Sequence, residues 1–106
     1  MTHSAVDSGI ILTATATGGA SATATLTGVA GKKFYILDIS VSSDLTGATV
    51  QVKDGSTVIW QDRISNMGAN IYDFDGYLIT SNTGNNLTVV ATGTAACNAN
   101  ITAAQL

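Results

Sequence analysis

Hydrophobic and polar residues alternate with a period of two along most of this chain. From Ile10 to Thr17, threonine alternates with leucine or alanine, and the alternation returns in residues 20–27 after Gly18-Gly19. A period of two is typical of a β-strand with one face exposed, because successive side chains of a strand point to opposite faces. These segments therefore predict two strands, and the glycine pair between them predicts a hairpin.

The segment 31–43, GKKFYILDISVSS, is the longest strongly β-prone run. Strict alternation divides its side chains between two faces: Tyr35, Leu37, Ile39 and Val41 on one, and Phe34, Ile36, Asp38 and Ser40 on the other. The strand begins apolar on both faces and then becomes polar on one. This pattern predicts a central strand between the two covered layers of a sandwich.

A second hairpin is predicted around Asp54-Gly55, because the segments on both sides alternate and Asp-Gly favours a two-residue turn. In its second strand, Trp60 is expected to share a face with Val58. Further strands are predicted over four segments: 71–74, 77–80, 87–92 and 94–103. Asp75-Gly76 is expected to form a tight turn or a bulge between the first two of these. The total of eight or nine short strands is typical of an all-β, antiparallel sandwich or barrel.

Composition narrows the classes of function. The chain has 106 residues, enough for one domain, and only 10% are charged, against roughly 25% in average soluble domains. The net charge of -3 supplies no basic field, so we expect no binding to nucleic acid or to an anionic membrane. The first ten residues have no cationic and apolar blocks typical of a secretory signal, so synthesis in the cytoplasm is expected. Residues 1–8 are expected to form a flexible arm, and residues 9–106 a single domain.

Few residues are suited to catalysis. His3 lies in the expected arm, and Cys97 alternates with alanines on the apolar face of the last predicted strand. Asp73 and Asp75 are expected to share a face and, with Asp62 or Asp54, could bind a hard cation such as Ca²⁺, but no EF-hand or Asp-rich loop spacing supports such a site. We therefore predict no catalytic residues, no cofactor and no metal, and the protein is not expected to be an enzyme.

The large side chains are the candidates for contact with partners. Trp60 and Tyr72 are expected to anchor either the core or an interface, and Tyr77 and Met67 are further interface candidates. An alternative is that Trp60, Tyr72 and Tyr77 form a flat exposed row that stacks on sugars, as in a carbohydrate-binding module.

The chain resembles the small structural β-sandwich proteins of tailed-phage virions, and most of all the head decoration, or cement, proteins. Four segments carry the resemblance, which extends from Ile10 to Leu106: ATATGGASATATLTGVAG, KKFYILDISVSS, ATVQVKDGSTVIWQ and GYLITSNTGNNLTVVATGTAACNANITAAQL. The resemblance implies a jelly-roll fold, a homotrimer and binding to the major capsid protein on the outside of the capsid, with no catalytic residues to transfer.

The function that follows from the resemblance is passive. A decoration protein stabilises the capsid by binding the assembled lattice, and several simultaneous contacts raise its effective affinity. In this interpretation, the arm formed by residues 1–8 reaches a neighbouring subunit. Two other functions are left open by the sequence: a structural subunit of a phage tail or neck, and a carbohydrate-binding module.

Overall fold

The computed structural model describes residues 10–19, 21–43, 48–64, 68–80, 83–93 and 96–106. The predicted arm, residues 1–8, lies outside these ranges. The described residues form eight strands and no helix. The strands are β1 (Ile10–Gly18), β2 (Ser21–Leu26), β3 (Phe34–Ser43), β4 (Thr49–Asp54), β5 (Thr57–Arg63), β6 (Gly68–Ile79), β7 (Leu87–Thr92) and β8 (Cys97–Gln105).

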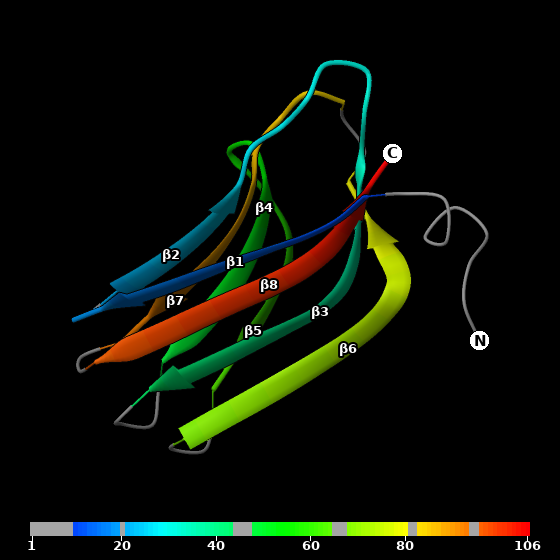
Figure 1. The fold of residues 1–106 in the computed structure, drawn as a ribbon. Coiled ribbons are helices and arrows are strands. Elements are labelled where there is room, and N and C mark those ends of the chain that lie inside the picture. Colours follow the sequence, from blue (N-terminus) through cyan, green and yellow to red (C-terminus); the bar gives the residue numbers. More distant parts are fainter. Residues whose placement is uncertain (1–9, 20, 44–47, 65–67, 81–82, 94–95) are drawn as a thin grey trace.

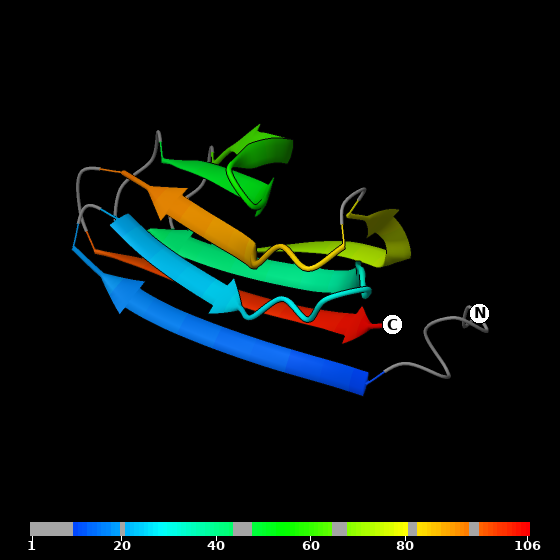
Figure 2. The same cartoon turned by 90° about the horizontal axis from the view of Figure 1, so that it is seen from above.

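The strands form two four-stranded sheets that pack face to face (Figures 1 and 2). The front sheet has the order β1-β8-β3-β6 and the back sheet has the order β2-β7-β4-β5, and every neighbouring pair is antiparallel. This order is that of a jelly roll. The predicted antiparallel sandwich is therefore confirmed, and β3 is an inner strand, as its sequence indicated.

The core lies between the inner faces of the two sheets. Its largest fully buried side chains are Phe34, Ile36, Ile39, Ile64, Leu87 and Ile101. Cys97 is 1% exposed and belongs to the same cluster, so it serves as a small apolar residue, as its position on the last strand predicted. On β8 the buried face continues through Ala99, Ile101 and Ala103.

The predicted hairpin at Gly18-Gly19 is wrong. The segment joins β1 of the front sheet to β2 of the back sheet, so these two strands stack across the sandwich instead of pairing within one sheet. The chain turns back tightly here, and a Cβ atom on Gly18 would collide with the backbone carbonyl of Ser21. Gly18 is therefore required by this close approach of the backbone.

The predicted faces of β3 are also wrong in its first half. The strand has a bulge between Ile36 and Asp38, where its register shifts against both β8 and β6. Phe34 and Ile36 point into the core before the bulge, and Ile39 and Val41 point into it after the bulge. The extra residue, Leu37, reverses the alternation and allows both halves of the strand to bury their apolar side chains.

The β4–β5 hairpin is confirmed, but its turn is one residue later than predicted. Asp54 pairs with Thr57, so the two turn residues are Gly55 and Ser56, and Gly55 has a φ of 63°. A glycine with positive φ at the first turn position is typical of a type II′ turn.

A bulge in β5 also separates Trp60 from Val58. Trp60 lies opposite the buried Val52, whereas Val58 lies opposite Lys53 on the outer face. The prediction that Trp60 and Val58 share a face is therefore wrong, because the register shifts between Val52 and Lys53.

Residues 71–74 and 77–80, predicted as two strands, belong mainly to one 12-residue strand, β6. The bulge that was one of the two options at Gly76 is present: Asp75 has a φ of 49° and Gly76 a φ of 82°. Thr80 follows the end of the strand, where its Oγ accepts a hydrogen bond of 2.9 Å from the backbone N–H of Phe34. The bulge gives β6 the sharp bend that is visible in Figure 1.

Candidate functional site

Three aromatic side chains join the edge strands β5 and β6 of the two sheets. The ring of Trp60 meets Tyr72 edge-on with centroids 4.8 Å apart, and it meets Phe74 edge-on with centroids 5.2 Å apart. All three rings are half-buried and pack against the core. This aromatic cluster therefore fills the side of the sandwich between β5 and β6.

The surroundings of Tyr72 change the titration of its phenol. Burial raises the pKa of Tyr72 above its ordinary value of 10.0, and a hydrogen bond to Asp62 and the negative charge of that carboxylate raise it further. Asp62 is itself exposed on β5. The interaction links the two sheets at their margin, and Tyr72 stays protonated at neutral pH.

The three aromatic residues proposed as a sugar-stacking row do not lie together. Trp60 and Tyr72 contact each other at the margin of the core, whereas Tyr77 is 64% exposed, two residues before Ile79 on the outer face of β6. These three rings therefore do not form a flat row. Met67, the remaining interface candidate, lies outside the described residues.

The carboxylates expected as candidates for a cation have other partners. Asp54 is buried at the end of β4 and accepts a hydrogen bond of 3.2 Å from the side-chain amide of Asn85. Asp73 accepts a hydrogen bond of 3.0 Å from the backbone N–H of Asp75. Within the described ranges, no group of three or more His, Cys, Asp or Glu side chains is placed to hold a metal ion. His3 lies outside those ranges.

The outer face of the front sheet presents rows of uncharged polar side chains. Residues directly opposite each other on antiparallel strands share a face. One row across the four strands contains Thr15, Asn100, Ser40 and Ile71. The next contains Thr17, Asn98 and Ser42. The register of the sheet thus gathers hydroxyl and amide groups from segments that lie far apart in the sequence.

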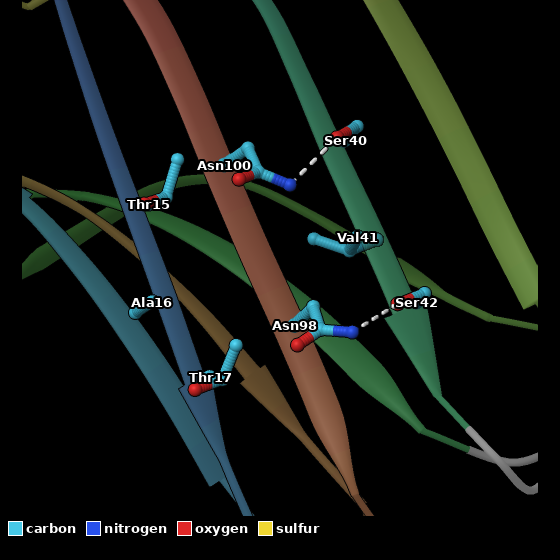
Figure 3. Close-up of a pocket in the computed structure, with 8 residues that line it drawn as sticks. All are labelled: Thr15, Ala16, Thr17, Ser40, Val41, Ser42, Asn98 and Asn100. Atoms are coloured by element: carbon cyan, nitrogen blue, oxygen red, sulfur yellow. Dashed lines mark hydrogen bonds between the residues drawn. The ribbon is translucent and has the colours of Figure 1, made fainter.

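A shallow hollow of about 240 Å³ lies over β1, β8 and β3 (Figure 3). The side-chain amide of Asn100 donates a hydrogen bond of 3.0 Å to Oγ of Ser40, and that of Asn98 donates one of 3.0 Å to Oγ of Ser42. Val41 and Ala16 also line it, together with Thr15 and Thr17 on its β1 side. Its lining contains no charged and no aromatic residue.

Exposed apolar side chains lie beside this polar face. Ile71 is 74% exposed in the same row as Ser40, and Tyr77 and Ile79 follow it along β6. Ile11 is 51% exposed and shares the outer face at the start of β1. We call the two polar rows, with Ile71 beside them, the front face. The adjoining row of the same sheet contains Asp38 and Asp73, and it separates the front face from Ile11 and Ile79. Such a mixture of neutral polar and apolar groups is typical of surfaces that contact other proteins.

The sequence indicated that the polar side chains of the front face would share one face of their own strands, but not which strands would be neighbours. The threonines of β1 and the asparagines of β8 each show the period of two, and that signal places each set on one face of its own strand. Ser40 and Ser42 belong with them only because β3 pairs with β8, and this pairing depends on the three-dimensional structure.

Comparison with known proteins shows the fold. No family model matches the chain, and no curated protein matches it. The chain is similar to the CBM36-1 domain of a multidomain xylanase from the hindgut metagenome of Trinervitermes trinervoides, with 16% identity, coverage of 91% of this chain and 95% of that one, and a TM-score of 0.45. It is also similar to the insecticidal delta-endotoxin Cry8Ea1 from Bacillus thuringiensis, with 11% identity, coverage of 92% of this chain and 20% of that one, and a TM-score of 0.50.

A third similar structure is the virus-like particle of extra small virus from the giant freshwater prawn Macrobrachium rosenbergii. Here the identity is 16%, the coverage is 92% of this chain and 79% of that one, and the TM-score is 0.40. Within the described ranges of the present chain, no helix is long and apolar enough to cross a membrane.

Proposed function

We propose that this protein is a non-enzymatic structural subunit of a virion that decorates the outside of the capsid and stabilises it through its front face. The observation that carries the proposal is the chemistry of that face: three strands present neutral hydroxyl and amide groups, and exposed Ile71 lies in the same row. Charged residues are depleted at the buried centres of protein interfaces, because their desolvation is costly.

The hydrogen bonds within this face support the same function. Asn98 and Asn100 are already held by Ser42 and Ser40, so their side chains lose little conformational freedom when a partner covers them. Each amide oxygen still has acceptor capacity for a donor on the partner. A preorganised neutral face of this kind binds a protein surface with a small entropic cost.

A decoration protein needs no catalytic group, and this proposal assigns none. The protein would act by mass action. Because it binds the assembled capsid and not the free subunits, it lowers the free energy of the assembled state. The partner in this proposal is the major capsid protein, and the expected location is the capsid surface. Residues 1–8 are proposed as an arm that reaches a neighbouring subunit.

The test uses particles assembled without this protein, from the virus whose genome carries the sequence. Purified protein is added, and its occupancy is measured by cryo-electron microscopy and by gel densitometry of sedimented particles. Ile71→Asp places a charge in the front face at an exposed position and is expected to reduce occupancy at least tenfold. Thr49→Asp, on an exposed position of the back sheet, is the matched control and is expected to bind like the unmodified protein. Equal occupancy for both variants would exclude the front face as the docking surface.

A second function is supported by the hollow itself. Hydroxyl and amide groups such as those of Thr15, Ser40 and Asn100 are the groups that bind the hydroxyls of neutral sugars. The hollow lacks an aromatic platform, which is why we rank carbohydrate binding second.

An array of neutral and acidic glycans distinguishes the two functions. Glycan binding that is lost in Asn100→Ala, together with no binding to particles, would favour the carbohydrate-binding module over the decoration protein. If cryo-electron microscopy finds the protein only in the tail or neck of the particle, the observation would instead favour a structural subunit of the tail or neck.

A further inference from the structure

Within the strands, charged residues occur only in β3, β4, β5 and β6. The strands β1 and β8 of the front sheet and β2 and β7 of the back sheet contain no charged residue at all. These four strands are adjacent in space, because β1 pairs with β8, β2 pairs with β7, and β1 lies across from β2. The four strands on this side of the sandwich are therefore uncharged.

The neutral side ends in two strand edges. Among the described residues, no strand pairs with the outer side of β1 or of β2. The opposite edges, β5 and β6, carry the features that protect an edge strand from pairing: β5 contains Asp62 and Arg63, β6 contains Asp73 and Asp75, and both strands have bulges. The nine residues of β1 have neither charge nor proline, and their register with β8 is regular. The β1 edge is thus open to pairing in a way that the opposite edges are not.

The sequence of β1 is suited to pairing with a second copy of itself. Its centre, Thr13-Ala14-Thr15-Ala16-Thr17, reads the same in both directions about Thr15. Two antiparallel copies related by a twofold axis at Thr15 therefore place threonine opposite threonine and alanine opposite alanine. The threonines stay on the outer face, where their hydroxyls can bond across the strands.

The same twofold axis can also relate the β2 strands of two back sheets. Thr15 lies three residues before Gly18, and Ala24 lies three residues after Ser21, so the two positions are equally far from the connection that joins β1 to β2. Thr23-Ala24-Thr25 also reads the same in both directions. A twofold axis perpendicular to both sheets can therefore pair β1 with its copy and β2 with its copy together.

We propose that two copies of this chain associate through their β1 and β2 edges about a twofold axis near Thr15 and Ala24, so that each four-stranded sheet continues into the partner. The interface is isologous, because each edge meets its own counterpart. Main-chain hydrogen bonds along the two β1 strands supply much of the affinity, as in other cases of strand addition.

Exposed apolar groups and the size of this side agree with the proposal. With Thr15 on the axis, the partner's Gly19 lies beside Ile11, which is 51% exposed, and a glycine leaves room for that side chain. The molecule measures 38 × 28 × 18 Å, so the side formed by β1 and β2 has a footprint of at most about 680 Å². Two such footprints total at most about 1,370 Å², so this side has room for an interface at the low end of the standard range, roughly 1,200–2,000 Å² in total. The resulting dimer differs from the trimer that the phage resemblance implies.

The first measurement is the mass of the purified full chain over a range of concentrations, by sedimentation equilibrium. The chain has a mass of 10.7 kDa, and we expect a dimer of twice that mass. Thr15→Lys and Thr15→Asp each place like charges opposite each other on the axis, so each is expected to weaken the dimer about fivefold or more. An equimolar mixture of the two variants is expected to restore the dimer, because lysine then meets aspartate. Thr49→Lys, at another exposed threonine on the inner strand β4, is the matched control and should leave the dimer intact.

A covalent probe keeps the proposal testable if the charged variants fold poorly. Thr15→Cys is expected to form a crosslinked dimer on mild oxidation, since opposed strand positions bring the two Cβ atoms near disulfide distance. The native Cys97 is buried and is not expected to interfere. A monomer at all concentrations, a trimer, or a dimer that neither responds to charge at residue 15 nor crosslinks there would overturn the proposal. Because only the purified chain is used, these outcomes are independent of whether the protein decorates a capsid.

Discussion

The rings of Trp60 and Tyr72 meet edge-on with their centroids 4.8 Å apart, and they connect β5 of the back sheet to β6 of the front sheet. Edge-on contact brings the positive rim of one ring to the negative face of the other. Because β5 and β6 are the last strands of their sheets, this pair stabilises the margin of the sandwich that carries the charged residues.

Removing the indole is expected to destabilise the whole domain. Trp60→Ala should lower the free energy of unfolding by about 3 kcal/mol, since it removes apolar packing as well as the ring contacts with Tyr72 and Phe74. Urea titration followed by far-UV circular dichroism measures the free energy of unfolding. Tryptophan fluorescence cannot be used, because Trp60 is the single tryptophan and the variant lacks it. Val58→Ala, on the outer face of the same strand, serves as the control and should cost less than about 1 kcal/mol. Equal effects would show that Trp60 is not an anchor.

Stability is expected to fall in alkali through Tyr72. Burial, and then the hydrogen bond and charge of Asp62, raise the pKa of Tyr72 above 10.0, so the folded state holds this proton more tightly than the unfolded state does. The stabilisation linked to this proton is therefore complete below pH 10 and is lost as the pH rises through the higher, folded pKa. Difference absorbance between the unmodified protein and Tyr72→Phe isolates this phenol. In Asp62→Asn, the pKa of Tyr72 should fall but stay above 10.0, because burial is the larger cause. A pKa of Tyr72 at or below 10.0 in the unmodified protein would contradict this account.

The bulge in β6 makes Gly76 a sensitive position. Its φ of 82° is strained for any residue with a Cβ, so Gly76→Ala should cost about 1–2 kcal/mol of unfolding free energy. Asp75→Asn is the control, since asparagine tolerates the φ of 49° found there and keeps the backbone N–H that bonds Asp73. Thermal unfolding of both variants measures the difference. A neutral Gly76→Ala would mean that the strand adopts another register.

Asn86 links two loops at one end of the sandwich. Its Oδ1 accepts a hydrogen bond of 2.8 Å from the backbone N–H of Gly28, and its backbone carbonyl accepts one of 2.9 Å from Gly55. Asn86→Ala should cost about 1 kcal/mol and speed hydrogen exchange at the amide of Gly28. Asn86→Asp keeps an acceptor at the same place, so its exchange rate should stay close to that of the unmodified protein. If the amide of Gly28 exchanges at an unchanged rate in Asn86→Ala, the hydrogen bond between Gly28 and Asn86 is excluded in solution.

Much of the fold was predictable, because its signals are local. The alternation in β1, β2 and β8 gave both the strands and their exposed faces, and the Asp54-Gly55 pair indicated the β4–β5 hairpin. The burial of Cys97 followed from the apolar face of its strand. A period of two is a property of a single segment, so it can be recognised without knowing the segment's neighbours.

The errors arose where the alternation was interrupted or where neighbours mattered. Leu37 in β3 and the bulge beside Trp60 in β5 each shift the register, and the sequence carries no glycine or proline there to indicate it. A bulge forms because the apolar residues on both sides of it must reach the same core, which depends on the partner strands.

The sequence by itself determined that this chain forms an antiparallel sandwich with a sparsely charged, hydroxyl-rich surface, since composition and period are present in the residues themselves. Only the tertiary structure decided that the segment after Gly18 joins two sheets, that Asn100 lies beside Ser40, and that the four uncharged strands lie together on one side of the sandwich. These relationships depend on strand order and register, and both are set by the packing of segments that are distant in the sequence around one shared core.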